Sequence, residues 1–209
     1  EHFVAWYRPE LEELTRVLAT GATVYLWGSD ESEGYLRPLM RDLGWGFRGS
    51  VTWDRVRSYA QVGYAKLKGF PNVTESCGLW MRGDPPFVGG LAMSNVWRLG
   101  PDGYQTERLI TGARTQRVKH QKTDWAESLH PCQKPLAFYD RLIRSSSRPG
   151  DTVLEPYGGT LRAAVACHRL PPSEARRAIV CEPHGPYIEA VRPSLEWVPP
   201  TVDGLGLFG

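Results

Sequence analysis

The sequence has few cysteines, little net charge and no long apolar run, and each shortage excludes a class of protein. Four of the 209 residues are cysteine, at positions 77, 132, 167 and 181, and no two of them form a C-x-x-C pair. Disulfide frameworks and structural zinc sites need clustered ligands, so we interpret these cysteines as reduced, mostly buried thiols of a cytoplasmic protein. No stretch approaches the roughly 20 apolar residues of a membrane span, and no signal peptide is recognisable.

The net charge of +2 does not indicate a nucleic-acid partner, so any such partner has to be inferred from local clusters of charge. Hydrophobic residues make up 41% of the chain and aromatic residues 11%, which predicts a packed core. The length suits one domain of ordinary size, or one domain with a small appendage. Because the chain begins at Glu1 rather than Met, we expect it to be part of a longer protein.

Apolar periodicity predicts helices and strands that alternate along the chain. Pro9 is expected to begin the first helix, because proline suits a first helical turn, and Gly21 to end it. The other predicted helices contain residues 35–43, 136–143, 163–166 and 187–191, and the predicted strands are 22–27, 47–53, 76–81, 96–99, 152–154, 178–181 and a short last one at 196–198. This order is typical of an α/β fold.

The segment 151–182 combines two acids with a glycine turn. Its first strand leads into Glu155 and a turn at Gly158 and Gly159, a helix follows, and the next strand ends at Glu182. Glycines let a ligand approach the backbone, the start of the helix offers free N–H groups, and the second acid can bind both hydroxyls of a ribose. The pattern suits a nucleoside cofactor, although glycine turns of this kind also occur in many α/β domains that bind nothing there.

A second motif, HPCQKP at 130–135, comes about twenty residues before DTVLEPYGGT at 151–160. Together the two resemble the β-class S-adenosylmethionine-dependent DNA amino-methyltransferases of bacteria. In that family HP-x-QKP precedes a helix and then a strand and turn of the form G-D-x-V-L-D-P-F-x-G-S-G-T. The likeness covers roughly residues 5–197. It implies an α/β, Rossmann-like methyltransferase fold in circularly permuted order, with a mostly parallel sheet and helices on both faces.

The resemblance also implies which residues bind S-adenosylmethionine. They are His130, Pro131, Gln133, Lys134, Glu155, Pro156, Tyr157, Gly158, Gly159, Thr160, Glu182 and Pro183. Leu161 departs from the family because a glycine is usual there, and leucine does not take a positive φ cheaply. We therefore expect an altered loop or weaker cofactor binding. His130 and Cys132 could instead bind a metal, but an isolated H-x-C pair is a poor zinc site, and no metal is expected.

The family's catalytic tetrapeptide, (D/N/S)-P-P-(Y/F/W), ends a strand that precedes the first helix seen here. That strand normally lies between the strands 152–154 and 22–27, so we expect the motif upstream of Glu1. A matching string does occur, and its residues are Asp84, Pro85, Pro86 and Phe87. We interpret it as a decoy, because no strong apolar strand leads into it and too few residues separate it from HPCQKP.

The stretch 108–122 has five Lys or Arg residues, one His and no acid. Composition alone favours a solvated surface loop, whereas the alternative is a flexible arm that contacts phosphates. On the second interpretation the residues that bind double-stranded DNA are Arg108, Arg114, Arg117, Lys119 and Lys122.

The resemblance divides the chain into four parts. Residues 1–83 form the half of the sheet that follows the catalytic motif, 84–129 a DNA-facing region for target recognition, 130–198 the cofactor-binding half and 199–209 a loose tail. The implied function is transfer of a methyl group from S-adenosylmethionine to the exocyclic amine of adenine or cytosine. Two alternatives stay open: a catalytically silent subunit that binds nucleic acid or an active partner, and methylation of RNA or a small molecule. Besides DNA, a second copy or a partner methyltransferase subunit is a candidate partner.

Overall fold

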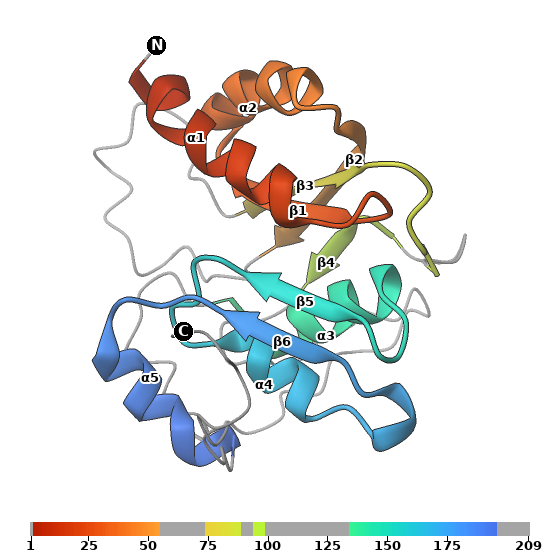
Figure 1. The fold of residues 1–209 in the computed structure, drawn as a ribbon, viewed down its shortest axis with the longest axis vertical. Helices are drawn as coiled ribbons and strands as arrows, with labels where there is room; N and C mark the ends of the chain where they lie inside the picture. Colours follow the sequence, from red (N-terminus) through yellow and green to blue (C-terminus); the bar gives the residue numbers. More distant parts are fainter. Residues whose placement is uncertain (1, 55–73, 89–93, 99–133, 196–209) are drawn as a thin grey trace, which may run out of the picture.

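The computed structural model describes residues 2–54, 74–88, 94–98 and 134–195, which form two layers of strands with helices around them (Figure 1). The predicted strand at 196–198 and Cys132 lie outside these residues. The helices are α1 (His2–Val17), α2 (Asp30–Asp42), α3 (Leu136–Ser146), α4 (Arg162–His168) and α5 (Gly185–Val191), with 3-10 turns η4 (Pro172–Glu174) and η5 (Arg192–Leu195). The strands are β1 (Thr23–Gly28), β2 (Gly46–Asp54), β3 (Thr74–Met81), β4 (Val96–Arg98), β5 (Thr152–Glu155) and β6 (Arg177–Val180).

The strands form a four-stranded sheet in the order β1-β3-β2-β4 and a separate parallel pair, β5 and β6. In the larger sheet β3 is antiparallel to both of its neighbours, whereas β2 and β4 are parallel. Because both neighbours oppose β3, the strands β1, β2 and β4 all run in one direction. The α/β class is confirmed. We expected a mostly parallel sheet. Three strands of the larger sheet do run in one direction, but the reversed strand β3 lies between two of them, so the sheet is mixed.

Helices α1 and α2 cover one face of the four-stranded sheet. Their shared core contains Leu11, Val24, Leu36, Leu39, Met40, Trp45 and Trp80. The prediction that Pro9 begins the first helix is wrong, because α1 starts at His2 and holds Pro9 inside it. An interior proline removes one backbone hydrogen bond, and its ring crowds the carbonyl group four residues earlier. The turn before it is retained because Val4 and Tyr7 pack against the core.

The ends of α2 follow from local hydrogen bonding. Its N-terminus has a capping box, in which the Ser29 side chain accepts the Ser32 N–H and the Ser32 side chain accepts the Ser29 N–H. The chain leaves the helix through Gly44, whose φ of +83° is a left-handed conformation that glycine adopts freely. The sequence predicted this end correctly but not the start, because serine pairs of this kind are also common in turns.

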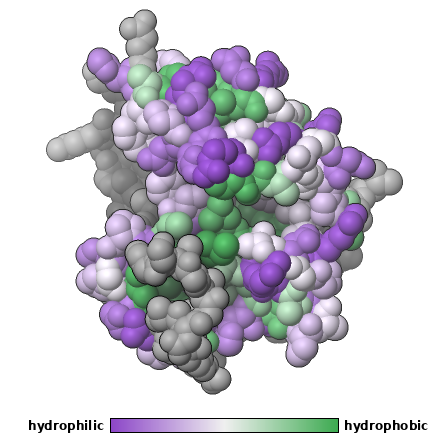
Figure 2. All heavy atoms as spheres, viewed as in Figure 1, coloured by the Kyte–Doolittle hydropathy of each residue, from purple (hydrophilic) through white to green (hydrophobic). Residues whose placement is uncertain are grey.

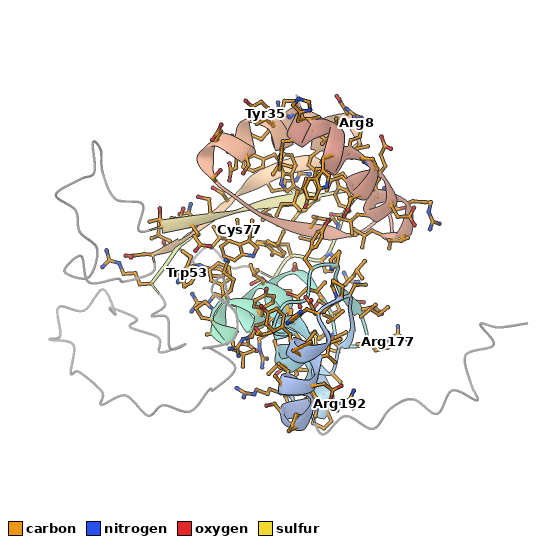
Figure 3. All side chains as sticks on the ribbon, turned by 90° about the vertical axis from the view of Figure 1, so that its left-hand side faces the viewer. Arg8, Tyr35, Trp53, Cys77, Arg177 and Arg192 are labelled. Carbon is orange, nitrogen blue, oxygen red and sulfur yellow. The ribbon has the colours of Figure 1, made fainter. Side chains whose placement is uncertain are left out.

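Helix α3 packs against the opposite face of the four-stranded sheet. Its Phe138 ring lies 4.7 Å from the Trp27 ring of β1 and 4.6 Å from the Trp97 ring of β4. Trp53 and Cys77 belong to this interior layer, between the sheet and α3 (Figure 3). Further along α3, Ile143 contacts the layer that contains β5 and β6, where it packs in one cluster with residues of α4. Helix α3 therefore joins the two layers.

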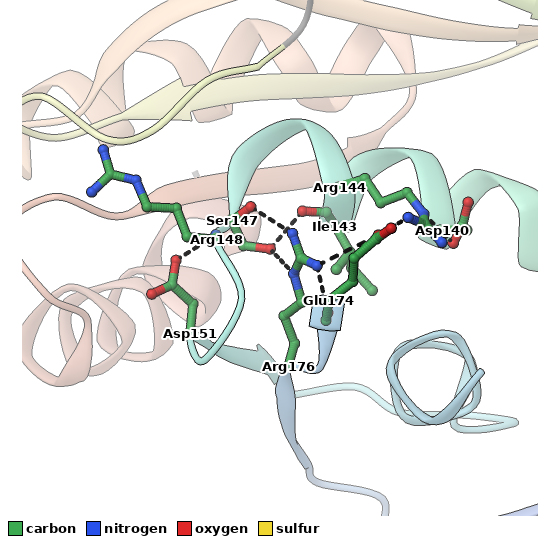
Figure 4. Close-up of polar contacts among 8 residues, drawn as sticks. All are labelled: Asp140, Ile143, Arg144, Ser147, Arg148, Asp151, Glu174 and Arg176. Carbon is green, nitrogen blue, oxygen red and sulfur yellow. Dashed lines mark hydrogen bonds and ion pairs between the residues drawn. The ribbon is translucent and has the colours of Figure 1, made fainter. Parts of the chain in front are cut away.

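A buried arginine fastens the C-terminal end of α3 to the segment that leads into β6. Arg176 is only 5% exposed at its side chain and donates to the backbone oxygen and the hydroxyl of Ser147 (Figure 4). It also donates to the backbone oxygen of Glu174, whose carboxylate pairs with Arg144 of α3. This network fixes the position of the β5–β6 pair relative to α3.

Apolar residues gather in the middle of one face of the molecule, between the part that carries α1 and β1 and the part that carries β5 and β6 (Figure 2). Among the described residues, β1 pairs only with β3, and β5 pairs only with β6. Each therefore has one edge without a neighbouring described strand. None of the helices in the described ranges has the length and apolar character needed to cross a membrane.

Candidate cofactor-binding site

The glycine turn after β5 lies directly against the end of β6. The Gly158 N–H donates to the Cys181 oxygen at 2.8 Å, which continues the pairing of the two strands beyond their ends. A Cβ atom at Gly158 would lie 2.3 Å from the Val180 side chain and 3.2 Å from the Cys181 oxygen. Only glycine fits this close approach, so the predicted turn has a defined steric cause.

Glu182 reaches back to this turn from the end of β6. One carboxylate oxygen accepts the Gly159 N–H at 2.6 Å, and the other accepts the His184 N–H at 2.7 Å. The structure thus brings the glycine turn and the second acid into direct contact, although they are 23 positions apart in the sequence. A carboxylate oxygen has more than one acceptor position, so each can accept a further donor from a ligand.

Glu155, the first acid, lies beneath the turn rather than on its surface. Its carboxylate accepts the Ala163 N–H of α4 at 3.2 Å and a hydrogen bond from the Tyr139 hydroxyl of α3. The pKa of Glu155 is raised to about 7, chiefly by burial and to a smaller extent by the nearby Glu182, while the two hydrogen bonds act in the opposite direction. The sequence did not point to Tyr139, because an aromatic residue on an apolar helix face is usually core.

Leu161 takes the left-handed conformation that a glycine usually provides. Its φ is +52° and its ψ is +39°, and it is the only residue other than glycine with a positive φ among those the structure describes. The side chain is buried against Val165 and Val191. The backbone therefore keeps the left-handed shape despite the leucine. Whether the residue weakens cofactor binding stays a prediction.

Tyr157 stands on the outer side of the turn. Its ring is more than half exposed, and its hydroxyl donates to the carboxylate of Glu10 on α1. This contact links the turn to the four-stranded layer. Of the other residues predicted to bind the cofactor, Thr160 is buried, and Pro156 and Pro183 are exposed.

Lys134 points to the other layer instead of to the glycine turn. Its ammonium nitrogen lies 2.7 Å from a carboxylate oxygen of Glu75 on β3 and 5.0 Å from the centre of the Trp27 ring. These contacts tie Lys134 to the four-stranded sheet, so its expected contact with the cofactor stays a prediction. His130, Pro131 and Gln133 lie outside the described residues.

The segment with Asp84 lies away from the glycine turn. The Asp84 oxygen is near Gly21, which precedes β1, and the Val88 N–H donates to the Ser145 oxygen in the last turn of α3. Gly21 and Ser145 both precede the start of a strand, β1 and β5 respectively, whereas the glycine turn follows the end of β5. Ligands of open α/β sheets bind outside the carboxyl ends of the strands, so this position differs from that of an expected active site.

The five basic residues of 108–122 lie outside the described residues. In the part of the chain that the structure does describe, no three His, Cys, Asp or Glu side chains come together as metal ligands would. Of the cysteines described, Cys77 and Cys167 are buried, as expected, and Cys181 is exposed.

Comparison with known proteins assigns this chain to a protein family. Residues 1–192 match the N6_N4_Mtase family, whose description is DNA methylase. The chain belongs to this family. Among curated relatives of this chain, the type II methyltransferase M.HpaI of Haemophilus parainfluenzae is 27% identical over 197 residues, covering 89% of this chain and 57% of the relative. M2.DpnII of Streptococcus pneumoniae is 26% identical over 180 residues, covering 86% and 62%. The chain thus spans about three-fifths of the length of these relatives.

Solved structures of DNA methyltransferases share the fold of this family member. The PvuII DNA methyltransferase, described as cytosine-N4-specific, superposes with a TM-score of 0.69 at 13% identity, covering 92% of this chain and 70% of that one. The complex of M1.HpyAVI with SAM superposes with a TM-score of 0.65 at 14% identity, covering 91% and 82%. The Rossmann-like methyltransferase fold predicted from the sequence is confirmed.

Proposed function

We propose that the chain is the larger part of a DNA amino-methyltransferase that transfers a methyl group from S-adenosylmethionine to the exocyclic amine of adenine or cytosine. Family membership supports the reaction class. The observation that carries the cofactor assignment is the 2.6 Å contact between the Glu182 carboxylate and the Gly159 N–H. It sets an acid able to accept ribose hydroxyls beside a glycine turn at the end of a parallel strand.

The residues of the turn have separate tasks in this proposal. Glu182 accepts the ribose hydroxyls with the lone pairs that Gly159 and His184 leave free. Gly158 allows the turn to lie close to β6. The bound cofactor supplies an activated methyl group for direct displacement, so the task of these residues is to hold it in one orientation toward the acceptor amine.

We also propose that the catalytic tetrapeptide precedes residue 1 in the full protein, on a strand that lies between β1 and β5. Each of these strands has one edge without a described partner, and apolar surface lies between the two layers (Figures 1 and 2). Curated relatives extend well beyond the part that this chain matches. In the family, the tetrapeptide hydrogen-bonds to the amine and stacks on the base, which is extruded from the duplex to reach the site.

Double-stranded DNA is the proposed substrate, and the basic stretch 108–122 the proposed phosphate contact, because five positive charges without an acid favour a polyanion. A silent subunit is the second candidate function. It is favoured by Leu161, a leucine with a φ of +52° where the family has glycine.

One experiment tests the cofactor site and the position of the catalytic group together. In the full-length protein, Glu182→Ala should weaken S-adenosylmethionine binding about 100-fold in calorimetry, because the cofactor no longer has a charged acceptor for its hydroxyls. Asp84→Ala is the matched control, since it also removes a carboxylate. It should leave both binding and methylation of DNA nearly unchanged.

Two results would contradict these proposals. Cofactor binding unaffected by Glu182→Ala would remove the ribose assignment, and loss of methylation in Asp84→Ala with binding intact would make the 84–87 segment catalytic. A full-length protein that binds the cofactor but methylates neither DNA nor RNA would favour the silent subunit.

A further inference from the structure

A chain of hydrogen bonds runs beneath the glycine turn and connects three elements. The Tyr139 hydroxyl of α3 bonds to the Glu155 carboxylate at the end of β5, and that carboxylate accepts the Ala163 N–H in the first turn of α4 at 3.2 Å. Glu155 and Ala163 lie on either side of the residues that form the turn. The position of the Glu155 carboxylate therefore affects both ends of the turn.

The Tyr139 hydroxyl can act as a hydrogen-bond donor throughout the pH range in which Glu155 ionises. Burial, and then the negative charge of Glu155, raise the pKa of Tyr139 well above its ordinary value. The hydroxyl consequently keeps its proton and donates it to the carboxylate. A buried carboxylate is costly unless such donors satisfy it, so the ionised form of Glu155 depends on these two bonds.

We propose that Tyr139 is a positioning residue of the cofactor site, whose hydroxyl holds the ionised Glu155 carboxylate against the start of α4 and thereby fixes the glycine turn. The inference rests on the proposed cofactor function. It assigns Tyr139 no contact with the cofactor. When Glu155 is protonated, its bonds to Tyr139 and Ala163 lose their ionic character and weaken.

Several other groups act on the Tyr139 and Glu155 pair. From the elements packed around it they are Arg162 and Cys167 on α4, Glu182 after β6 and Cys77 on β3. Arg176, just before β6, acts on Cys167. Cys77 and Cys167 have raised pKa values, because both are removed from water. These thiols therefore stay neutral, and Glu182 is the nearby carboxylate that opposes ionisation of Glu155.

The pH dependence follows from the direction of each effect. The pKa of Glu155 is raised to about 7, so the carboxylate ionises as the pH rises through that value, and the turn is fixed above it. S-adenosylmethionine should thus bind more tightly above pH 7 than below. Removing the Tyr139 hydroxyl takes away a hydrogen bond that favours the ionised form of Glu155. The midpoints of Glu155 ionisation and of the change in cofactor affinity should therefore both rise by about 1 pH unit.

The experiment compares Tyr139→Phe with Tyr25→Phe in the full-length protein. Tyr25 is a matched control, since both tyrosines are partly buried and the Tyr25 hydroxyl bonds to Ser146 on α3 rather than to Glu155. NMR of carbon-13-labelled glutamate, with Glu155→Gln to identify the signal, follows the ionisation of Glu155 in the free protein. Calorimetry between pH 6 and pH 9 measures S-adenosylmethionine binding in the same variants.

We expect Tyr139→Phe to raise the Glu155 transition and the binding transition together, with neither moved in Tyr25→Phe. In a Glu155→Gln background, Tyr139→Phe should change cofactor affinity no further. An unchanged Glu155 titration in Tyr139→Phe, or a moved titration with an unmoved binding profile, would overturn the inference. If wild type and all variants fail to bind the cofactor, the proposed function fails, while the titration still decides whether Tyr139 holds Glu155.

Discussion

At the scale of single residues, Leu161 shows how a side chain can compensate for an unfavourable backbone. A left-handed conformation costs a residue with a Cβ atom about 1 kcal/mol or somewhat more. Leu161 is nevertheless held there, because its side chain is buried among Val165, Val191 and their neighbours. Burying a leucine contributes about 2 kcal/mol, which exceeds the backbone cost.

This balance predicts an unusual order of stability. At ordinary helical positions alanine is more stable than glycine by about 1 kcal/mol. At position 161 both substitutions remove the buried side chain, but only glycine also relieves the strain. Leu161→Gly should therefore unfold at a higher urea concentration than Leu161→Ala, with both below the wild type. The usual order, with alanine above glycine, would show that Leu161 is not strained in solution.

At the scale of the elements, α3 is the piece that the two layers share. Its first turn follows Lys134, which is held by Glu75 of β3 and by the Trp27 ring of β1. Its last turn is held by Arg176, which precedes β6 (Figure 4). These contacts anchor the helix at both ends, so α3 sets the distance between the four-stranded layer and the glycine turn.

Lys134 and Glu75 should be energetically coupled, because both side chains are largely removed from water. The side chain of Lys134 is 13% exposed and that of Glu75 is 29% exposed. A double-mutant cycle with Lys134→Met and Glu75→Gln should give an interaction energy of about 1–2 kcal/mol in chemical denaturation. The pair Glu13 and Arg16 on α1 is the control, since both side chains are exposed to water, and it should show no measurable coupling. Equal values for the two pairs would show that Lys134 does not anchor α3.

At the scale of the whole molecule, the described residues supply the glycine turn, which is the proposed cofactor site, and its scaffold. The DNA contact is proposed for a stretch outside those residues. Replacing Arg114, Arg117 and Lys119 with Gln should weaken DNA binding and flatten the slope of log K against log salt by roughly 0.9 for each phosphate that is no longer neutralised. Replacing the exposed Arg148, Arg169 and Arg177 removes the same charge elsewhere and should have a smaller effect. Equal effects would show that only net charge matters.

Local pattern was enough to predict most elements of this protein. The apolar runs and turn residues identified β1, β3 and the glycine turn, because strand and turn preferences depend on neighbours in the sequence. The family was recognised from HPCQKP and the turn that follows, and the match over residues 1–192 agrees with it. The start of α1 was predicted seven residues late, because tertiary packing of Val4 and Tyr7 overrides the signal from Pro9.

What the sequence determined by itself is therefore the family, the α/β class and the two acids that flank the turn. Tertiary structure alone decided which donors each acid meets: Gly159 for Glu182, and Tyr139 with Ala163 for Glu155. It also directed Lys134 to β3. These contacts join residues that are far apart along the chain or lie on different elements, and their partners are chosen by how the layers pack, which no local pattern of residues encodes.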